Sequence, residues 1–286
     1  SANVMLFEQA KPVFVDIDPV TLNIDPSLID AAITEQTVGI LPVHLFGYPC
    51  DMEAINALAS ECGLWVVEDA CEALGAHYAD ATLVGASQNL SVFGFYPNKQ
   101  LATGEGGMVV CPTPELKERI DSERNQGRAP NMGWLDHERL GYNYRLSDVA
   151  AAIGVAQIEK LDQMLIARDQ VAAWYTERLS EYPELALPCK NFDGNLRGWF
   201  VYVVELPAAL DRDALIAQLA AAGIASKPYM PVIHLQPFYR ERFGYGPGDF
   251  PIAEAVAARS LALPFFPSMT EQQVERVCTT LAELLG

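Results

Sequence analysis

Short continuous runs of hydrophobic residues recur through the first 110 positions of the chain. Such runs are typical of strands buried in a parallel sheet. Between two of them, Asp51 is a plausible N-cap for a helix whose apolar residues follow helical spacing, and Gly63 ends that helix. Strands that alternate with helices predict an α/β fold with a mostly parallel sheet. We therefore predict strands at residues 13–17, 38–43, 64–69, 90–95 and 108–110, and helices at 26–33 and 52–62.

In the second half of the chain, hydrophobic residues follow helical spacing more often than in the first half. Ser147 or Asp148 opens a long stripe of apolar residues that extends to about Leu179, which predicts one long helix. Thr270 and Gln273 form a capping box at the start of the last helix. We further predict a loop at residues 129–144, strands at 199–206 and 224–229, and helices at 112–127, 212–222 and 251–260.

The length of 286 residues suggests one large domain and a smaller one. Arg168 interrupts the apolar stripe of the long helix, at a place where the helix could leave one core for another. We therefore place the boundary near residue 160. Residues 1–160 are predicted to form a large α/β domain, and residues 161–286 a small α+β domain.

Composition narrows the classes of function. Half of the residues are hydrophobic, but no run of eighteen apolar residues could cross a membrane, and the first residues lack the pattern of a signal peptide. The net charge of −18 argues against a surface for nucleic acid. The six cysteines are scattered and form no CxxC pair, which favours free thiols in a reducing cytoplasm over disulfides or zinc. We expect a cytoplasmic protein without a metal site.

Lys99 and Asp69 are the residues around which the chemistry can be organised. Lys99 follows the strand pattern 90–95 and is either a solvated surface cation or a buried amine that can form a Schiff base. Asp69 ends the strand pattern 64–69, where open α/β sheets gather ligands. Its carboxylate could bind a metal, a ribose hydroxyl or a pyridinium nitrogen. Pairing with a pyridinium nitrogen is the role that best accounts for the lysine as well, because Lys99 and Asp69 together could hold pyridoxal phosphate.

The sequence resembles the DegT/DnrJ/EryC1/StrS family of sugar aminotransferases. The motifs that carry the resemblance fall in the family's order and cover nearly the whole chain; they are KPVFVDID, PVHLFG, EDACEALGA, FGFYPNKQLATGEGGMVV, LGYNYRLSDVAAAIG and PVIHLQPFY. The resemblance implies a three-layer large domain of the aspartate-aminotransferase fold (type I of the pyridoxal-phosphate enzymes). It also implies amino transfer to a nucleotide-linked keto sugar from an amino acid, glutamate, through pyridoxal and pyridoxamine phosphate, and a homodimer with a shared active site.

The resemblance also implies roles for the residues that match the motifs. Lys99 matches the lysine that binds the cofactor and moves the proton, and Asp69 the carboxylate that pairs with the ring nitrogen. Cys71 matches a small residue that packs on the cofactor ring, and an ordinary place in the hydrophobic core explains it equally well. Glu72 stands where the family often has Gln or His near the ring hydroxyl. Gly94 stands where many members carry a phosphate-binding serine.

Further positions match residues of the family's substrate and partner contacts. Asn143 matches an asparagine that reaches the phosphate of the neighbouring subunit's cofactor, or it caps a loop. His234 matches a histidine near the sugar pocket, or it is structural. Tyr229 and Lys227 precede it and could contact hydroxyl or phosphate groups of the substrate.

In the family, a leading segment with a Gly-Thr pair for the cofactor phosphate and an aromatic residue for the ring precedes the point where this chain opens. We therefore expect an N-terminally shortened version of a longer parent. Two alternative functions remain open. One is a sugar dehydratase of the same family, in which histidine replaces the lysine, so that Lys99 disfavours it. The other is a cofactor-free regulatory or binding protein, which Glu72 and Gly94 motivate.

Overall fold

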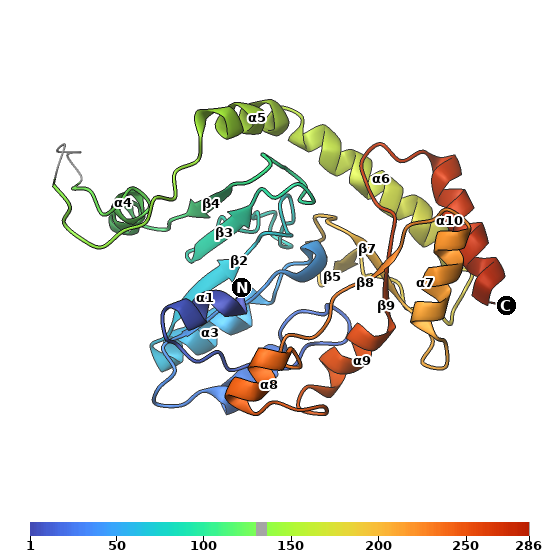
Figure 1. The fold of residues 1–286 in the computed structure, drawn as a ribbon, viewed down its shortest axis with the longest axis horizontal. Coiled ribbons are helices and arrows are strands. Elements are labelled where there is room, and N and C mark those ends of the chain that lie inside the picture. Colours follow the sequence, from blue (N-terminus) through green and yellow to red (C-terminus); the bar gives the residue numbers. More distant parts are fainter. Residues whose placement is uncertain (130–135, 286) are drawn as a thin grey trace.

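A four-stranded sheet organises the first part of the chain in the computed structural model, which describes residues 1–129 and 136–285. Its strands lie in the order β1 (Gly39–Ile40), β2 (Trp65–Asp69), β3 (Leu90–Gly94) and β4 (Gly107–Val110). The first three strands are parallel, and β4 pairs antiparallel with β3. The predicted α/β fold with a mostly parallel sheet is therefore confirmed (Figure 1).

Local sequence signals define the helices near this sheet. The Asp51 carboxylate accepts the N–H of Ala54 and caps α3 (Met52–Cys62), and Gly63 ends α3 in a left-handed conformation. The predicted helix 26–33 is α2 (Pro26–Ile29) followed by the 3-10 turn η1 (Asp30–Ala32). The remaining elements of this part are α1 (Ala2–Phe7), the 3-10 turn η2 (Leu45–Gly47) and α4 (Pro114–Glu123), which is shorter than the predicted 112–127.

The predicted strand at residues 13–17 is wrong. Ile17 makes an isolated antiparallel bridge with Ile24, and no ladder extends along the segment. The segment packs instead against the C-terminal part of the chain. The Asp16 carboxylate accepts the N–H groups of Ile252 and Ala253 at 3.0 and 2.9 Å, at the start of α9 (Pro251–Arg259). Because these helical N–H groups need acceptors, Asp16 caps a helix 236 residues away.

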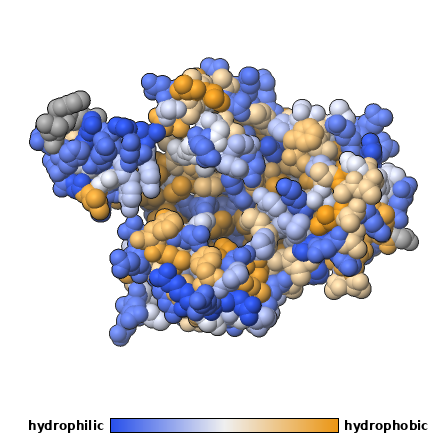
Figure 2. Space-filling view, viewed as in Figure 1, coloured by the Kyte–Doolittle hydropathy of each residue, from blue (hydrophilic) through white to orange (hydrophobic). Residues whose placement is uncertain are grey.

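The predicted long helix 148–179 is two helices, α5 (Asp148–Ile158) and α6 (Leu161–Leu179). Ser147 caps α5 through the N–H of Ala150, as expected. Figure 1 shows α5 and α6 running along the top of the molecule toward α10. No side chain of α5 is buried, and Figure 2 shows hydrophobic side chains over this helix. Residues 130–135 of the predicted loop, and Gly286, lie outside the described residues.

A second sheet lies in the C-terminal part of the chain. Its order is β7 (Tyr202–Glu205), β9 (Ser260–Leu263) and β8 (Lys227–Pro228), all antiparallel. Sequence analysis missed β9, because residues 251–260 fit a helix and the four residues that follow the helix carry no separate signal. The other elements here are the hairpin β5 (Asn191–Phe192) and β6 (Asn195–Leu196), and the helices α7 (Arg212–Ala221), α8 (Pro237–Phe243) and α10 (Glu271–Leu285).

The largest hydrophobic core joins α6, α7 and α10 to the second sheet. Tyr175, Tyr202, Leu219, Leu261 and Leu281 are all fully buried in it. The predicted capping box starts α10: the N–H of Thr270 donates to Gln273 Oε1 at 2.9 Å, and the N–H of Gln273 donates to Thr270 Oγ1 at 3.2 Å. None of the helices formed by residues 1–129 and 136–285 combines the length and apolar character that crossing a membrane requires.

Candidate active site

The ends of β2 and β3 lie at one edge of the large sheet. These strands are parallel, and their register pairs Asp69, the last residue of β2, with Val92. After β3 ends at Gly94, a turn in which the Lys99 N–H donates to the Tyr96 carbonyl at 2.9 Å carries the chain to Lys99. Lys99 and Asp69 both act electrostatically on Cys71 and Glu72, so the four residues belong to one cluster at this edge.

Hydrogen bonds hold the Asp69 carboxylate in its ionised form. Oδ1 accepts the N–H of Cys71 at 3.1 Å, and Oδ2 accepts the hydroxyl of Ser1. Burial alone would raise the pKa of this carboxyl group, but the hydrogen bonds outweigh burial and hold the pKa of Asp69 below its usual value. A fixed negative charge therefore lies at the carboxyl end of β2.

Lys99 and Glu72 form an ion pair that water hardly reaches. Lys99 Nζ lies 3.3 Å from Glu72 Oε1, and the two side chains are only 17% and 10% exposed. The other carboxylate oxygen, Oε2, accepts the N–H of Phe46 at 3.0 Å. Burial raises the pKa of Glu72, although the charge of Lys99 and the hydrogen bond from Phe46 act in the opposite direction. A carboxyl group that is more basic than usual thus faces the candidate lysine.

Cys71 and Gly94 touch each other across the two strand ends. A Cβ atom at Gly94 would lie 3.3 Å from Cys71 Sγ, which is tighter than most real contacts. A serine side chain at position 94 would therefore crowd the sulfur, which gives the glycine a packing reason. Burial and the Asp69 charge raise the pKa of Cys71 to about 12, so the thiol stays protonated at neutral pH and offers volume rather than a nucleophile.

Three aromatic rings line the space around the Lys99–Glu72 pair. Lys99 Nζ lies 4.3 Å from the ring centroid of Phe200. The ring of Tyr229 lies 5.6 Å from Phe46 and 6.4 Å from Phe200. Burial, with a smaller contribution from Glu72, raises the pKa of Tyr229 to about 12. The predicted substrate residue Tyr229 is thus brought to the cluster as a neutral phenol that can donate a hydrogen bond.

Sequence reasoning missed Phe46, Phe200, Gln100 and Arg168 as parts of this site. Gln100 Nε2 donates to the carbonyls of Glu72 and Gly198 at 2.5 and 3.1 Å. Arg168 Nη1 donates to the Phe200 carbonyl at 3.2 Å, which explains why a charged residue interrupts the apolar stripe of α6. Gln100 directly follows Lys99, so its place in the sequence was a signal that could have identified it. No local signal points to Phe200.

The structure does not bring the other predicted residues into this cluster. Asn143 makes an isolated bridge with Asn125 in the segment between α4 and α5, and its side chain is exposed. Lys227 is exposed on β8, where it pairs with Ala262. His234 is buried, and its Nε2 lies 3.0 Å from Glu254 Oε1, with its ring centroid 4.7 Å from that of Phe250.

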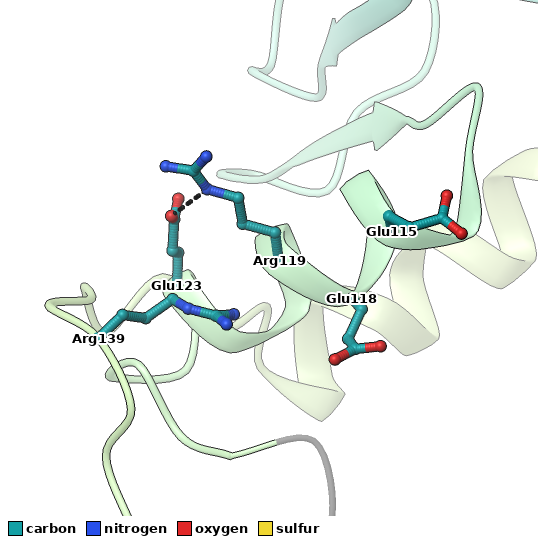
Figure 3. Close-up of a pocket in the computed structure, with 5 residues that line it drawn as sticks. All are labelled: Glu115, Glu118, Arg119, Glu123 and Arg139. Carbon is teal, nitrogen blue, oxygen red and sulfur yellow. Dashed lines mark hydrogen bonds and ion pairs between the residues drawn. The ribbon is translucent and has the colours of Figure 1, made fainter.

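A cavity of about 390 Å³ lies on α4, away from the strand ends. Glu115, Glu118, Arg119, Glu123 and Arg139 line it, and none of them is a predicted site residue (Figure 3). Figure 3 shows Arg119 paired with Glu123, and Nε and Oε1 of this pair are 2.8 Å apart. Because acidic side chains outnumber the basic ones here and all five residues are exposed or half-exposed, this cavity is a charged surface hollow rather than a second catalytic cluster.

Two curated relatives are similar to this chain along nearly all of its length. The pleiotropic regulatory protein of Geobacillus stearothermophilus is 42% identical over 277 residues, which cover 96% of this chain and 72% of the relative. The GDP-perosamine synthase of Caulobacter vibrioides is 36% identical over 293 residues, which cover 100% of this chain and 76% of the relative. The similarity thus includes both halves of this chain.

A solved structure and a family model also match this chain along nearly all of its length. The crystal structure of DesV from S. venezuelae in complex with a ketimine intermediate matches with a TM-score of 0.90 and 36% identity, over 96% of this chain and 72% of DesV. The family model described as the DegT/DnrJ/EryC1/StrS aminotransferase family matches residues 1–282. The chain therefore belongs to the DegT/DnrJ/EryC1/StrS aminotransferase family, whose members are pyridoxal-phosphate-dependent sugar aminotransferases.

Proposed function

We propose that this protein transfers the amino group of glutamate to the keto group of a nucleotide-linked sugar, with pyridoxal phosphate held between Lys99 and Asp69. The observation that carries the proposal is the cluster at the β2 and β3 ends, where a half-buried amine faces a carboxyl group beside the ionised Asp69. The family membership and the 36% identity to a GDP-perosamine synthase support the substrate class.

The donor set of the cluster fits this cofactor. Lys99 offers an amine that can bond to an aldehyde, and Asp69 offers a carboxylate that stays ionised and can pair with a protonated ring nitrogen. Cys71 and Gly94 are small residues that pack against each other at the strand ends. When bound, the protonated ring withdraws electrons from the carbon that bears the amino group.

The chain's own residues then have distinct tasks. Lys99 would hold the cofactor, and its amine, when neutral, would accept and return a proton during the transfer. Asp69 keeps the ring nitrogen protonated. The ring of Phe200 lies against the amine, and Tyr229 packs on both Phe200 and Phe46; these rings reduce the access of water, which strengthens the electrostatic interactions inside the site.

For substrate binding we propose Tyr229 as a hydrogen-bond donor to the sugar, because its phenol stays neutral near Glu72. The exposed Lys227 lies two residues earlier and offers a positive charge to the diphosphate of the nucleotide. His234 would contribute indirectly, since its contact with Glu254 fixes the segment that follows Tyr229.

We also propose a homodimer with a shared site. Val149, Val155 and Ile158 on α5 are 74%, 59% and 58% exposed, and α5 has no buried residue. An apolar helix of this kind is expected at an interface between subunits. The segment before α5 carries the exposed Asn143, which we assign to the cofactor phosphate of the partner subunit.

Two organisational expectations remain proposals. The domain boundary at residues 160 and 161 coincides with the break between α5 and α6, which supports the division into residues 1–160 and 161–286. The free cysteines, which include Cys50, Cys71 and Cys278, support a reducing compartment such as the cytoplasm.

An isotope-transfer experiment tests the proposed reaction. The purified protein is incubated with pyridoxal phosphate, ¹⁵N-glutamate and a panel of GDP- and dTDP-linked keto sugars, and mass spectrometry detects labelled amino sugar. We expect label in one sugar product, none with Lys99→Ala, and unchanged transfer with Lys117→Ala, whose exposed side chain pairs with Asp121 on α4. Binding of the cofactor without label in any sugar would contradict the substrate class.

A cofactor-free regulatory role is the second candidate, and its regulatory part agrees with the name of the 42% identical relative. The departures at Glu72 and Gly94 from the family's usual residues agree with it. Titration with pyridoxal phosphate separates the two candidates. Saturable binding of one molecule per chain rules out a regulatory role without cofactor, and a full-length protein that binds no cofactor rules out the aminotransferase.

A further inference from the structure

We infer that Glu72 is the catalytic base that takes the proton from Lys99 when this amine attacks pyridoxal phosphate, an inference that rests on the proposed function. The family resemblance implies a place for Glu72 near the ring hydroxyl, where a carboxylate would repel a phenolate. In the structure the carboxylate faces the amine instead, and this orientation gives the departure from Gln or His a chemical use.

The geometry holds Glu72 in the position that a base needs. The N–H of Phe46 donates to Oε2 at 3.0 Å and fixes one carboxylate oxygen, which leaves Oε1 facing Lys99 Nζ at 3.3 Å. The Phe46 backbone has a positive φ of 52°, a conformation that a phenylalanine rarely adopts. Gln100 binds the Glu72 carbonyl at 2.5 Å, so both the backbone and the carboxylate of Glu72 are held.

The proposed step conserves charge inside the site. An N–H bond of the Lys99 ammonium breaks, its electron pair stays on nitrogen, and the proton forms an O–H bond with Glu72 Oε1. An ion pair thereby becomes a neutral pair, so no net charge appears in a place where both side chains are mostly hidden from water. The neutral amine can then attack the aldehyde. Burial, which raises the pKa of Glu72, makes its carboxylate a better proton acceptor than an exposed glutamate.

The other titratable groups around Glu72 do not compete for this role. The pKa of Asp69 is lowered by its hydrogen bonds, so its carboxylate is the weaker base. Cys71 and Tyr229 both have a pKa raised to about 12, so at neutral pH they keep their own protons. The other groups that the described residues place against the pair, the N–H of Phe46, the amide of Gln100 and the ring of Phe200, do not titrate. Lys99 and Glu72 are therefore the pair that can exchange a proton.

The rate of cofactor capture as a function of pH tests this inference. Stopped-flow absorbance follows the visible band that lysine-bound pyridoxal phosphate gives, for the wild type, Glu72→Gln, Glu72→Asp and Glu105→Gln. Glutamine keeps the size of Glu72 and an oxygen for Phe46 but cannot accept a proton. Glu105 supplies the control, since its exposed side chain loses the same charge on the loop between β3 and β4 that also carries Lys99. Dividing each rate by that of the wild type at the same pH cancels the ionisations of the cofactor itself.

We expect Glu72→Gln to capture the cofactor about a hundredfold more slowly than the wild type at about pH 6. The deficit should shrink about tenfold per pH unit, because the amine of the variant must lose its proton to solvent. Glu72→Asp should recover part of the rate, and Glu105→Gln should match the wild type. Equal or faster capture by Glu72→Gln, with a ratio that does not change with pH, would overturn the inference while leaving the proposed function intact. A wild type that gives no visible band at all would instead refute the proposed function, and the inference with it.

Discussion

Asp69 keeps its negative charge although its side chain is half-buried, because hydrogen bonds from Cys71 and Ser1 outweigh burial. A carboxylate that stays ionised can hold a proton on a pyridine nitrogen without itself becoming protonated. The neighbouring Glu72 is shifted in the opposite direction by burial. Two carboxyl groups three residues apart thus carry different charges over part of the pH range, which is the arrangement expected when one anchors and the other exchanges protons.

The substitution Asp69→Asn should weaken pyridoxal phosphate binding at least tenfold, because an amide cannot neutralise the protonated ring, and each pKa unit of that interaction corresponds to about 1.4 kcal/mol. An absorbance titration measures the dissociation constant. Since the pKa of Asp69 is lowered in the folded state, its contribution to stability is complete above about pH 4 and is lost as the pH falls through the lowered value. Urea unfolding at several pH values checks this. An unchanged affinity would show that Asp69 does not contact the ring.

At the scale of elements, the 3-10 turn η2 joins the large sheet to the segment before β7. The N–H of Gly198 donates to the Gly47 carbonyl at 2.9 Å, and Arg197 Nη1 donates to the Phe46 carbonyl at 2.9 Å. Through this contact, Phe200 reaches Lys99 from about a hundred residues further along the chain. The site therefore depends on a backbone crossing in which two glycines touch.

Replacing Gly47 with alanine should destabilise the protein by about 2–5 kcal/mol, because a left-handed residue with a Cβ costs about 1–2 kcal/mol and overpacking adds about 1–3 kcal/mol. A Cβ at Gly47 would lie 1.9 Å from the Gly198 carbonyl oxygen. Gly63 is the matched control: its φ of 67° is also left-handed, but nothing lies within 4 Å of its Cβ position. Gly63→Ala should therefore cost only the conformational part, about 1–2 kcal/mol, in urea unfolding. Equal losses in the two variants would contradict the close crossing.

Much of this local structure could be predicted, and the physical reasons differ by element. The strands around Asp69 and Lys99 are confirmed because continuous apolar runs specify buried parallel strands. Residues 13–17 have the same pattern but bind the start of α9, and only the folded chain brings that helix near. Phe200 is likewise beyond prediction, since its place over Lys99 depends on contacts across the two sheets and not on local spacing.

At the scale of the whole molecule, α5 is an apolar surface that no other part of the described chain buries. It is apolar on every side, its residues are exposed or half-exposed, and the hydrophobic patch over it is visible in Figure 2. Apolar surface of this kind is stabilised when it is removed from water, at about 25 cal/mol per Å². A second copy of the chain placed here would cover α5.

The substitution Val149→Glu should therefore raise the dimer dissociation constant at least tenfold, because it removes apolar contact and buries a charge, a loss of more than about 1.4 kcal/mol. Sedimentation velocity over a range of protein concentrations measures this constant. Val20→Glu is the control, because Val20 is 49% exposed and lies far along the chain from α5. A wild type that sediments as a monomer, or a variant that dimerises equally well, would remove α5 from the interface.

The central claim is that Lys99 and Asp69 hold one pyridoxal phosphate between them, and covalent trapping tests it most directly. The protein is incubated with the cofactor, reduced with borohydride and digested, and mass spectrometry locates the modified lysine. The account predicts one pyridoxyl group per chain, on the peptide that contains Lys99, and none in Lys99→Ala. A protein that stays unlabelled, or one that carries the label on other lysines with Lys99 unmodified, would contradict it.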